Sequence, residues 1–317
     1  MLTNVTQGNV SDNTEVVRVS VAEINIMMVT VQVMAGVCLS VNCLLVFTFF
    51  RKEAFRTNTR YILFAQALCM DSVMLVLTDF AFLLFYFYIP LPAAACIVLC
   101  MLMEILTYTT PLTLTAMCLE RYVAICMPLR HADISTARTR LGVILIIWAL
   151  GSIPPLIDFF ILLSSKAQRF YTEKQMCSYE MLFQKQWQSY LRSALSQFYF
   201  LVIAFIIGFV YIQIVSAATA ASANNKSSTY KARKTIILHA CQLLLSLIPL
   251  ICPFVENSIF EIDLRAYINL RYLDFVAFTI APRCLSPLIY GLRDEKFFLV
   301  LKYYAICGLN KKISPIV

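Results

Sequence analysis

Seven long apolar segments constrain the fold of this chain more than any other feature. Each is long enough to cross the hydrocarbon core of a bilayer as a helix, which takes about 20 residues. Helices are expected because lipid offers no partners to backbone N–H and C=O groups. The sequence therefore predicts an all-α membrane protein, a bundle of seven transmembrane helices. The segments run over about residues 24–50, 59–88, 96–119, 140–163, 191–219, 235–255 and 269–292.

The composition supports a membrane location. Charged residues make up 14% of the chain and hydrophobic residues 60%, whereas soluble domains carry about 25% charged residues. The net charge of +8 is a matter of membrane topology and does not indicate nucleic-acid binding. Because the loops are short, we expect one bundle over 24–292, preceded by an extracellular tail over 1–23. A cytoplasmic helix and tail would follow over 293–317.

The distribution of basic residues predicts the orientation of the bundle. With the N-terminus outside, most Lys and Arg residues fall in segments that lie inside the cell, as the positive-inside rule requires. The loop after the fourth segment is an exception, because it would carry basic residues outside. Glycosylation sequons at Asn4 and Asn9 also favour an external N-terminus. The first 20 residues lack the apolar core of a cleavable signal peptide.

Two stretches resemble a known family. Residues 114–131 read LTAMCLERYVAICMPLRH, an apolar helix that turns charged at its Glu-Arg-Tyr motif, and residues 286–294 read SPLIYGLRD. They resemble the cytoplasmic ends of helices three and seven of rhodopsin-like G-protein-coupled receptors. The phrases ERYVAIC-PLRH and PLIYGLRDEKF are most similar to odorant receptors of the fish-type branch. The resemblance implies the seven-helix fold and a short amphipathic C-terminal helix on the inner membrane surface.

The resemblance also implies a set of switch residues on the cytoplasmic side. Arg121 would be restrained by Glu120 and would turn towards the G protein on activation. Tyrosines of this set could instead belong to an interfacial aromatic belt, and His239 could be a packed histidine or a polar latch. The full set is Glu120, Arg121, Tyr122, Tyr211, His239, Pro287 and Tyr290.

Ionisable residues inside membrane spans are candidates for functional sites, because burying them is costly. The resemblance places Arg283 beside Asp71 and gives Asp71 a partner asparagine, Asn42. We therefore predict an Asp71–Arg283 ion pair in this polar centre, where related receptors hold sodium, and signalling that is insensitive to sodium. Alternatively, Arg283 binds backbone carbonyls. For Asp158, near the outer end of its span, we favour a position at the membrane interface.

The expected ligand cavity lies in the outer half of the bundle. There, Glu104 could anchor a cationic group, act as a protonated hydrogen-bond donor, or serve only the packing of neighbouring helices. An ionised Glu104 favours a basic or zwitterionic ligand. The candidate ligand-binding residues are Met103, Glu104, Thr107, Tyr108, Leu250 and Phe254.

Most of the 12 cysteines fall inside apolar spans, where cysteine behaves as a small hydrophobic residue. The resemblance implies a disulfide between Cys96 and Cys177, both facing an oxidising compartment. Cys177 is the only cysteine of its loop, so a second loop disulfide is not expected. Cys307 could be palmitoylated or unmodified.

The function implied is that of a chemosensory receptor. It would bind a small-molecule odorant and activate a heterotrimeric, olfactory-type stimulatory G protein that raises cyclic AMP. A rhodopsin-like receptor for a peptide, lipid or hormone is the alternative. We see no internal repeats that indicate a transporter, no catalytic arrangement of an enzyme, no metal-ligand cluster and no cofactor motif. Expected partners are membrane lipids and a trafficking chaperone, and the expected location is the plasma membrane of olfactory cilia.

Overall fold

The computed structural model contains five helices, among the residues that it describes, that are long and apolar enough to cross a membrane. They agree with the first five predicted spans. The described residues are 21–51, 53–182, 186–221, 264–285 and, singly, 245, 247, 248, 251, 252, 255, 259, 300 and 301. The helices are α1 (Val21–Arg51), α3 (Thr59–Tyr86), α4 (Ala93–Cys126), α6 (Ala137–Ser165) and α7 (Gln186–Ala221).

The seventh predicted span is helical in its described part. It consists of α10 (Leu264–Asp274), the π-helical turn η4 (Phe275–Ile280) and helical residues 281–285. Most of the sixth predicted span lies outside the described residues. So do residues 1–20 of the expected N-terminal tail and nearly all of the expected cytoplasmic helix and tail.

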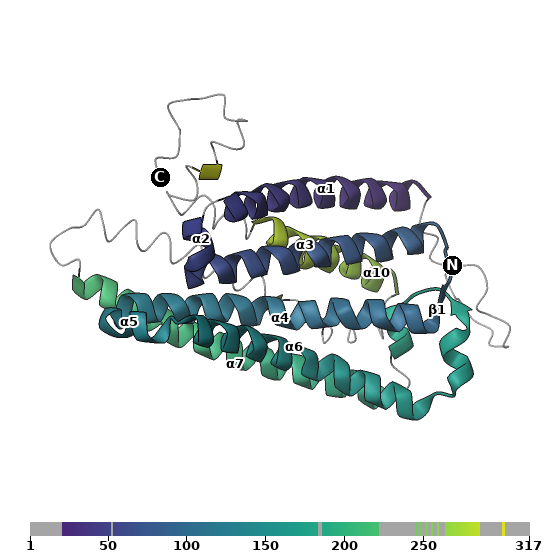
Figure 1. The fold of residues 1–317 in the computed structure, drawn as a ribbon. Coiled ribbons are helices and arrows are strands. Elements are labelled where there is room, and N and C mark those ends of the chain that lie inside the picture. Colours follow the sequence, from purple (N-terminus) through teal and green to yellow (C-terminus); the bar gives the residue numbers. More distant parts are fainter. Residues whose placement is uncertain are drawn as a thin grey trace, which may run out of the picture.

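Short elements mark the two ends of the bundle (Figure 1). At one end, which we call the sheet end, Leu91 of β1 (Leu91–Pro92) pairs antiparallel with Gln175 of β2 (Lys174–Gln175). The 3-10 helices η1 (Gln168–Thr172) and η2 (Tyr179–Leu182) belong to the same loop as β2. At the other end, the α5 end, are α2 (Glu53–Thr57) and α5 (Pro128–Ile134).

Two long helices begin at the α5 end with side-chain caps. The Asn58 side chain accepts a hydrogen bond from Arg60 N at the start of α3, and Thr136 accepts one from Thr139 N at the start of α6. Such caps satisfy backbone N–H groups that have no partner within the helix. The caps fix where α3 and α6 begin, just beyond the turns that connect them to α2 and α5.

Helix α4 lies at the centre of the described bundle and packs against α3, α6 and α7. Pro111 interrupts its backbone ladder. Buried threonine hydroxyls around Pro111 donate to carbonyls one turn earlier; Thr113 bonds Thr109 O at 2.9 Å and Thr115 bonds Pro111 O at 2.8 Å. In this way α4 buries polar side chains without leaving their hydroxyls unpaired.

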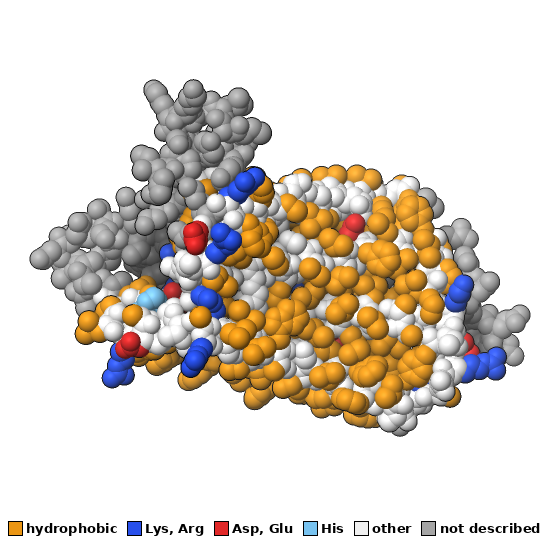
Figure 2. Space-filling view, in the orientation of Figure 1, with side chains coloured by type: hydrophobic (Ala, Val, Ile, Leu, Met, Phe, Trp, Pro, Cys, Tyr) orange, Lys and Arg blue, Asp and Glu red, His pale blue; other side chains and the backbone are white. Residues whose placement is uncertain are grey.

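The outside of the bundle is strongly apolar. Large hydrophobic side chains such as Val29, Phe160 and Phe205 are exposed. Hydrophobic side chains also cover most of the face of the bundle that Figure 2 shows. Basic side chains gather mainly at the α5 end, with a smaller group at the sheet end. An exposed apolar belt between two polar ends is what a lipid bilayer requires.

Close packing between α4 and α6 depends on Gly151. A Cβ atom at this position would lie 2.3 Å from Thr109 Cγ2 and 3.3 Å from Thr109 N. We expect Gly151→Ala to destabilise the receptor by about 1–3 kcal/mol, because the two helices must separate. The measurement is thermal unfolding of the purified protein.

A matched control lies on the same helix. A Cβ atom at Gly142 meets nothing within 4 Å, so Gly142→Ala should be neutral or stabilising by up to about 1 kcal/mol through helix propensity. Equal losses of stability in the two variants would show that the α4–α6 contact at Gly151 is not tight.

Candidate functional site

A buried cluster of charged side chains lies near the sheet end. Arg192 Nε of α7 is 3.4 Å from Glu104 Oε1 of α4, and their side chains are only 17% and 1% exposed. The Arg192 guanidinium also lies over the ring of Tyr179, 3.9 Å from its centroid. Cation–π contact of this kind is strongest where water is excluded. Arg192 therefore links two helices and the loop that covers them.

A disulfide fixes that loop. Cys96 in the first turn of α4 is bonded to Cys177, with their Cα atoms 5.4 Å apart, which confirms the predicted pairing. It holds Tyr179, two residues further on, above the charged cluster. Burial, together with the nearby carboxylates of Glu104 and Asp158, raises the pKa of Tyr179 well above its usual range. The phenol is therefore neutral at physiological pH.

Asp158 belongs to the same cluster, and it is buried within the protein. It is in α6, and only 5% of the residue is exposed. It is close enough for the charges of Glu104 and Arg192 to act on it. Its Oδ2 atom has no hydrogen-bond partner among the described residues. Helix α6 continues to Ser165, about two turns beyond Asp158.

Only some of the other predicted ligand residues are described by the structure, and those lie on α4 near this cluster. Tyr108 is buried, and its hydroxyl lies 2.7 Å from Ser196 Oγ of α7. Thr107 donates to Met103 O at 2.9 Å, and both residues are half-buried. Leu250 and Phe254 lie outside the described residues. Tyr108 thus adds a second polar link between α4 and α7, four residues along α4 from Glu104.

Arg192 itself was missed by the sequence analysis. It lies inside the fifth predicted span, so the rule that flags ionisable residues in spans could have found it. It stands next to the predicted start of that span, at residue 191, and was not singled out. In the structure α7 begins at Gln186, which places Arg192 well inside the helix.

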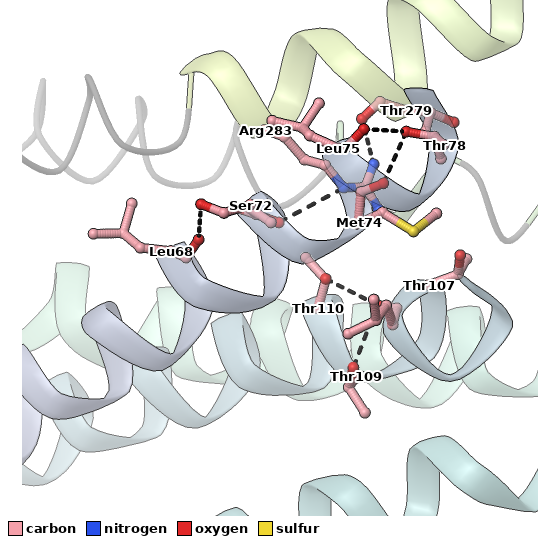
Figure 3. A network of polar contacts seen from close by, with 12 residues as sticks. Leu68, Ser72, Met74, Leu75, Thr78, Thr107, Thr109, Thr110, Thr279 and Arg283 are labelled. Carbon is pink, nitrogen blue, oxygen red and sulfur yellow. Dashed lines mark hydrogen bonds and ion pairs between the residues drawn. The ribbon is translucent and has the colours of Figure 1, made fainter. Parts of the chain in front are cut away.

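A second polar site joins α3 to the seventh span. Arg283 Nε lies 3.7 Å from Asp71 Oδ1, and both side chains are buried, so the predicted ion pair is present. Arg283 Nη1 also donates a hydrogen bond to Thr279 O. Arg283 therefore makes both predicted contacts, the ion pair with Asp71 and a hydrogen bond to a backbone carbonyl. Figure 3 shows Arg283 reaching across to α3 near Ser72 and Thr78. Asn42 is fully buried in α1, but no hydrogen bond joins it to Asp71 in the described part of the chain.

A second disulfide lies beside this polar site. Cys38 of α1 is bonded to Cys284, with Cα atoms 5.0 Å apart. We expected cysteines inside spans to behave only as small hydrophobic residues, and for this pair that expectation is wrong. The two cysteines are 246 residues apart in sequence, so no local sequence pattern indicates that they form a disulfide. The bond ties α1 to the residue next to Arg283.

The switch residues that the structure describes lie at the α5 end. Glu120 Oε1 is 3.4 Å from His131 Nε2 of α5, a contact that the sequence analysis missed. Tyr122 packs against Phe209 of α7, with ring centroids 6.4 Å apart. Arg121 and Tyr211 are half-buried. His239, Pro287 and Tyr290 lie outside the described residues, as do Asn4, Asn9 and Cys307.

Apolar helices of spanning length, with buried charges within them and a loop held to α4 by a disulfide, define a helical membrane protein. The sequence pattern described as "7 transmembrane receptor (rhodopsin family)" matches residues 41–290. This chain belongs to that family, and its fold is the seven-helix bundle. The family consists of receptors and not of enzymes.

Three curated relatives show the range of similarity. Odorant receptor 131-2 of Danio rerio is 43% identical over 280 residues, which cover 88% of this chain and 86% of the relative. Olfactory receptor 52A1 of Homo sapiens is 29% identical over 195 residues, or 58% and 59% of the two chains. Adenosine receptor A3 of Ovis aries is 22% identical over 307 residues, or 90% and 93%.

Proposed function

We propose that this protein is an odorant receptor that binds a small molecule near the sheet end and activates a heterotrimeric G protein at the α5 end. The observation that carries the proposal is the 43% identity to a fish odorant receptor over 88% of the chain. The separation of the two sites along the bundle supports it. A buried charged cluster lies near one end, and the Glu120–Arg121–Tyr122 motif lies near the other.

The proposed orientation has the sheet end outside the cell. The Cys96–Cys177 disulfide needs an oxidising environment, and most of the basic side chains visible in Figure 2 gather at the α5 end. The N-terminal tail, with sequons at Asn4 and Asn9, would then be extracellular. We expect the receptor in the plasma membrane of olfactory cilia, delivered there with the help of a trafficking chaperone and surrounded by lipid.

The proposed mechanism is a shift of a pre-existing equilibrium. A ligand that binds the active arrangement more tightly raises its population in proportion to that difference in affinity. Arg121 then leaves its restraint and contacts the G protein, with Tyr211, Tyr290, Pro287 and His239 completing the rearrangement. The G protein is of the stimulatory, olfactory type, so cyclic AMP rises.

A second candidate function stays within the family. The similarity to an adenosine receptor over 90% of the chain favours a non-olfactory receptor for a small molecule such as a hormone, lipid or peptide. The two proposals differ in where the receptor is made. Transcripts confined to sensory epithelium support the odorant receptor, whereas broad expression supports the alternative.

The proposal is tested by measuring cyclic AMP in cells that express the receptor with an olfactory G protein. Pools of water-soluble amines, amino acids and carboxylic acids are applied, and surface expression is measured in the same cells. A rise of cyclic AMP that cells without the receptor lack would support the function. Silence in every pool, with the receptor at the surface and an olfactory G protein present, would count against it.

Signalling should be insensitive to sodium. The Asp71 carboxylate already has a buried cationic partner in Arg283, so a sodium ion at Asp71 would have to compete with a fixed charge. We expect less than about a twofold change in agonist potency when sodium is replaced by choline at constant ionic strength. A potency that changes tenfold or more would contradict the role assigned to this pair.

A further inference from the structure

We infer that the buried cluster of Glu104, Asp158 and Arg192 is a binding site for a small organic cation, the ammonium group of a protonated amine. This inference rests on the proposed function, because it names the chemical class of the ligand that the receptor would detect. It takes up one of the three alternatives for Glu104, an anchor for a cationic group, and extends it to Asp158 and Arg192.

The charge balance of the cluster carries the inference. Three helices, α4, α6 and α7, each contribute one charged side chain, two carboxylates and one guanidinium. When all three are ionised, the described members of the cluster therefore have one negative charge in excess. Because Arg192 is paired with Glu104, the excess lies mainly on Asp158.

An excess charge is costly at this depth. Glu104 and Asp158 are at least nine-tenths buried, and a buried charge that lacks a counter-charge is strongly unfavourable. Asp158 Oδ2 also has no hydrogen-bond partner among the described residues, whereas Glu104 is engaged by Arg192 and Tyr179. Folding has thus placed an acceptor on Asp158 that nothing in the described part of the chain satisfies.

An ammonium group supplies what the cluster lacks. It carries one positive charge and three N–H donors, so one group can neutralise the excess and donate to oxygens of both carboxylates. Hydrogen bonds between ionised groups are the strongest of their kind. The neutral phenol of Tyr179 and the hydroxyl of Tyr108 border the site without adding charge.

Other classes of ligand fit the cluster less well. A carboxylate would add a third negative charge, and the guanidinium that could receive it already contacts Glu104 and the ring of Tyr179. A neutral ligand would leave the excess charge in place. A proton shared by the two carboxylates is the remaining competitor, and experiment can separate it from an amine.

The test uses methylammonium, the smallest probe with the chemistry of an amine, on the purified full-length receptor. Ligands that bind only the folded state raise the Tm. At about 50 mM methylammonium chloride we expect the Tm to be roughly 2–5 °C higher than in sodium chloride of equal concentration. Sodium acetate and methanol at that concentration should have no such effect.

Isosteric variants assign the effect to the cluster. Asp158→Asn removes the excess charge, so it should abolish the methylammonium shift and raise the Tm measured without ligand. Glu104→Gln should abolish the shift as well. Asp133→Asn, at an exposed position of α5, is the matched control and should keep the full shift.

Three results would overturn the inference. They are the absence of a methylammonium shift in the wild type, an equal shift in Asp158→Asn, and a rise of Tm on acidification to which methylammonium adds nothing. The last result would identify a proton as the counter-charge. Nucleotide exchange on a purified G protein, measured on the same samples, tests the proposed function separately. A methylammonium shift without coupling would leave the cation site standing and count against the odorant receptor.

Discussion

Replacing Arg283 with Met is expected to lower the Tm of the receptor by roughly 10 °C, from a loss of about 3–5 kcal/mol. The variant leaves Asp71 buried without its counter-charge, which lies 3.7 Å away in the wild type. The double variant with Asp71→Asn should recover most of the loss, because it removes both charges together. Thermal unfolding of the purified receptor measures both effects, and the double-mutant cycle isolates the interaction energy of the pair.

A surface ion pair provides the matched control. Arg169 Nε lies 3.7 Å from Glu173 Oε1, the same separation as in the buried pair, but the Arg169 side chain is 91% exposed, against 7% for Arg283. Exposed pairs contribute little because water and salt screen them, so Arg169→Met should leave the Tm nearly unchanged. If the two single variants had equal effects, burial would not determine the cost, and the structural role of the Asp71–Arg283 pair would be refuted.

The second large effect concerns signalling. We expect Arg121→Ala to reduce the ligand-dependent rise in cyclic AMP to roughly one hundredth of the wild-type response or less, since the proposed contact with the G protein is lost. Arg121 is half-buried at the α5 end, so surface expression must show that the variant still folds. Surface expression and cyclic AMP are measured in the same cells.

Arg56→Ala is the control for this effect. Arg56 is an exposed arginine of α2 at the same end of the bundle, and its loss removes the same charge without touching the Glu-Arg-Tyr motif. Its response should stay within about threefold of the wild type. A full response from Arg121→Ala would show that this receptor signals without the arginine on which the mechanism depends.

The sequence predicted features that follow from chemistry along the chain. Long apolar segments have few alternatives to membrane helices, and the first five proved to be helices where expected. The Asp71–Arg283 pair was predicted because the family resemblance places the two residues side by side and because opposite charges inside spans need partners. The Cys96–Cys177 bond came from the family resemblance rather than from spacing.

The features that were missed depend on the lateral arrangement of helices. The contact of Arg192 and Asp158 with the Glu104 cluster depends on how α4, α6 and α7 pack side by side. The contact between Glu120 and His131 requires α5 to fold back towards α4. The Cys38–Cys284 bond requires α1 and the seventh span to be neighbours. One sequence carries no direct signal for either arrangement.

The central claim is that this chain, on its own, transmits the binding of a small molecule to a G protein. The most direct test is guanine-nucleotide exchange on a purified stimulatory G protein, with the purified receptor in lipid vesicles and a compound that was active in the cyclic AMP screen. We predict that the compound accelerates exchange by at least about tenfold and that Arg121→Ala removes the acceleration. Exchange at the rate of receptor-free vesicles, with the receptor folded and oriented in the membrane, would contradict the claim.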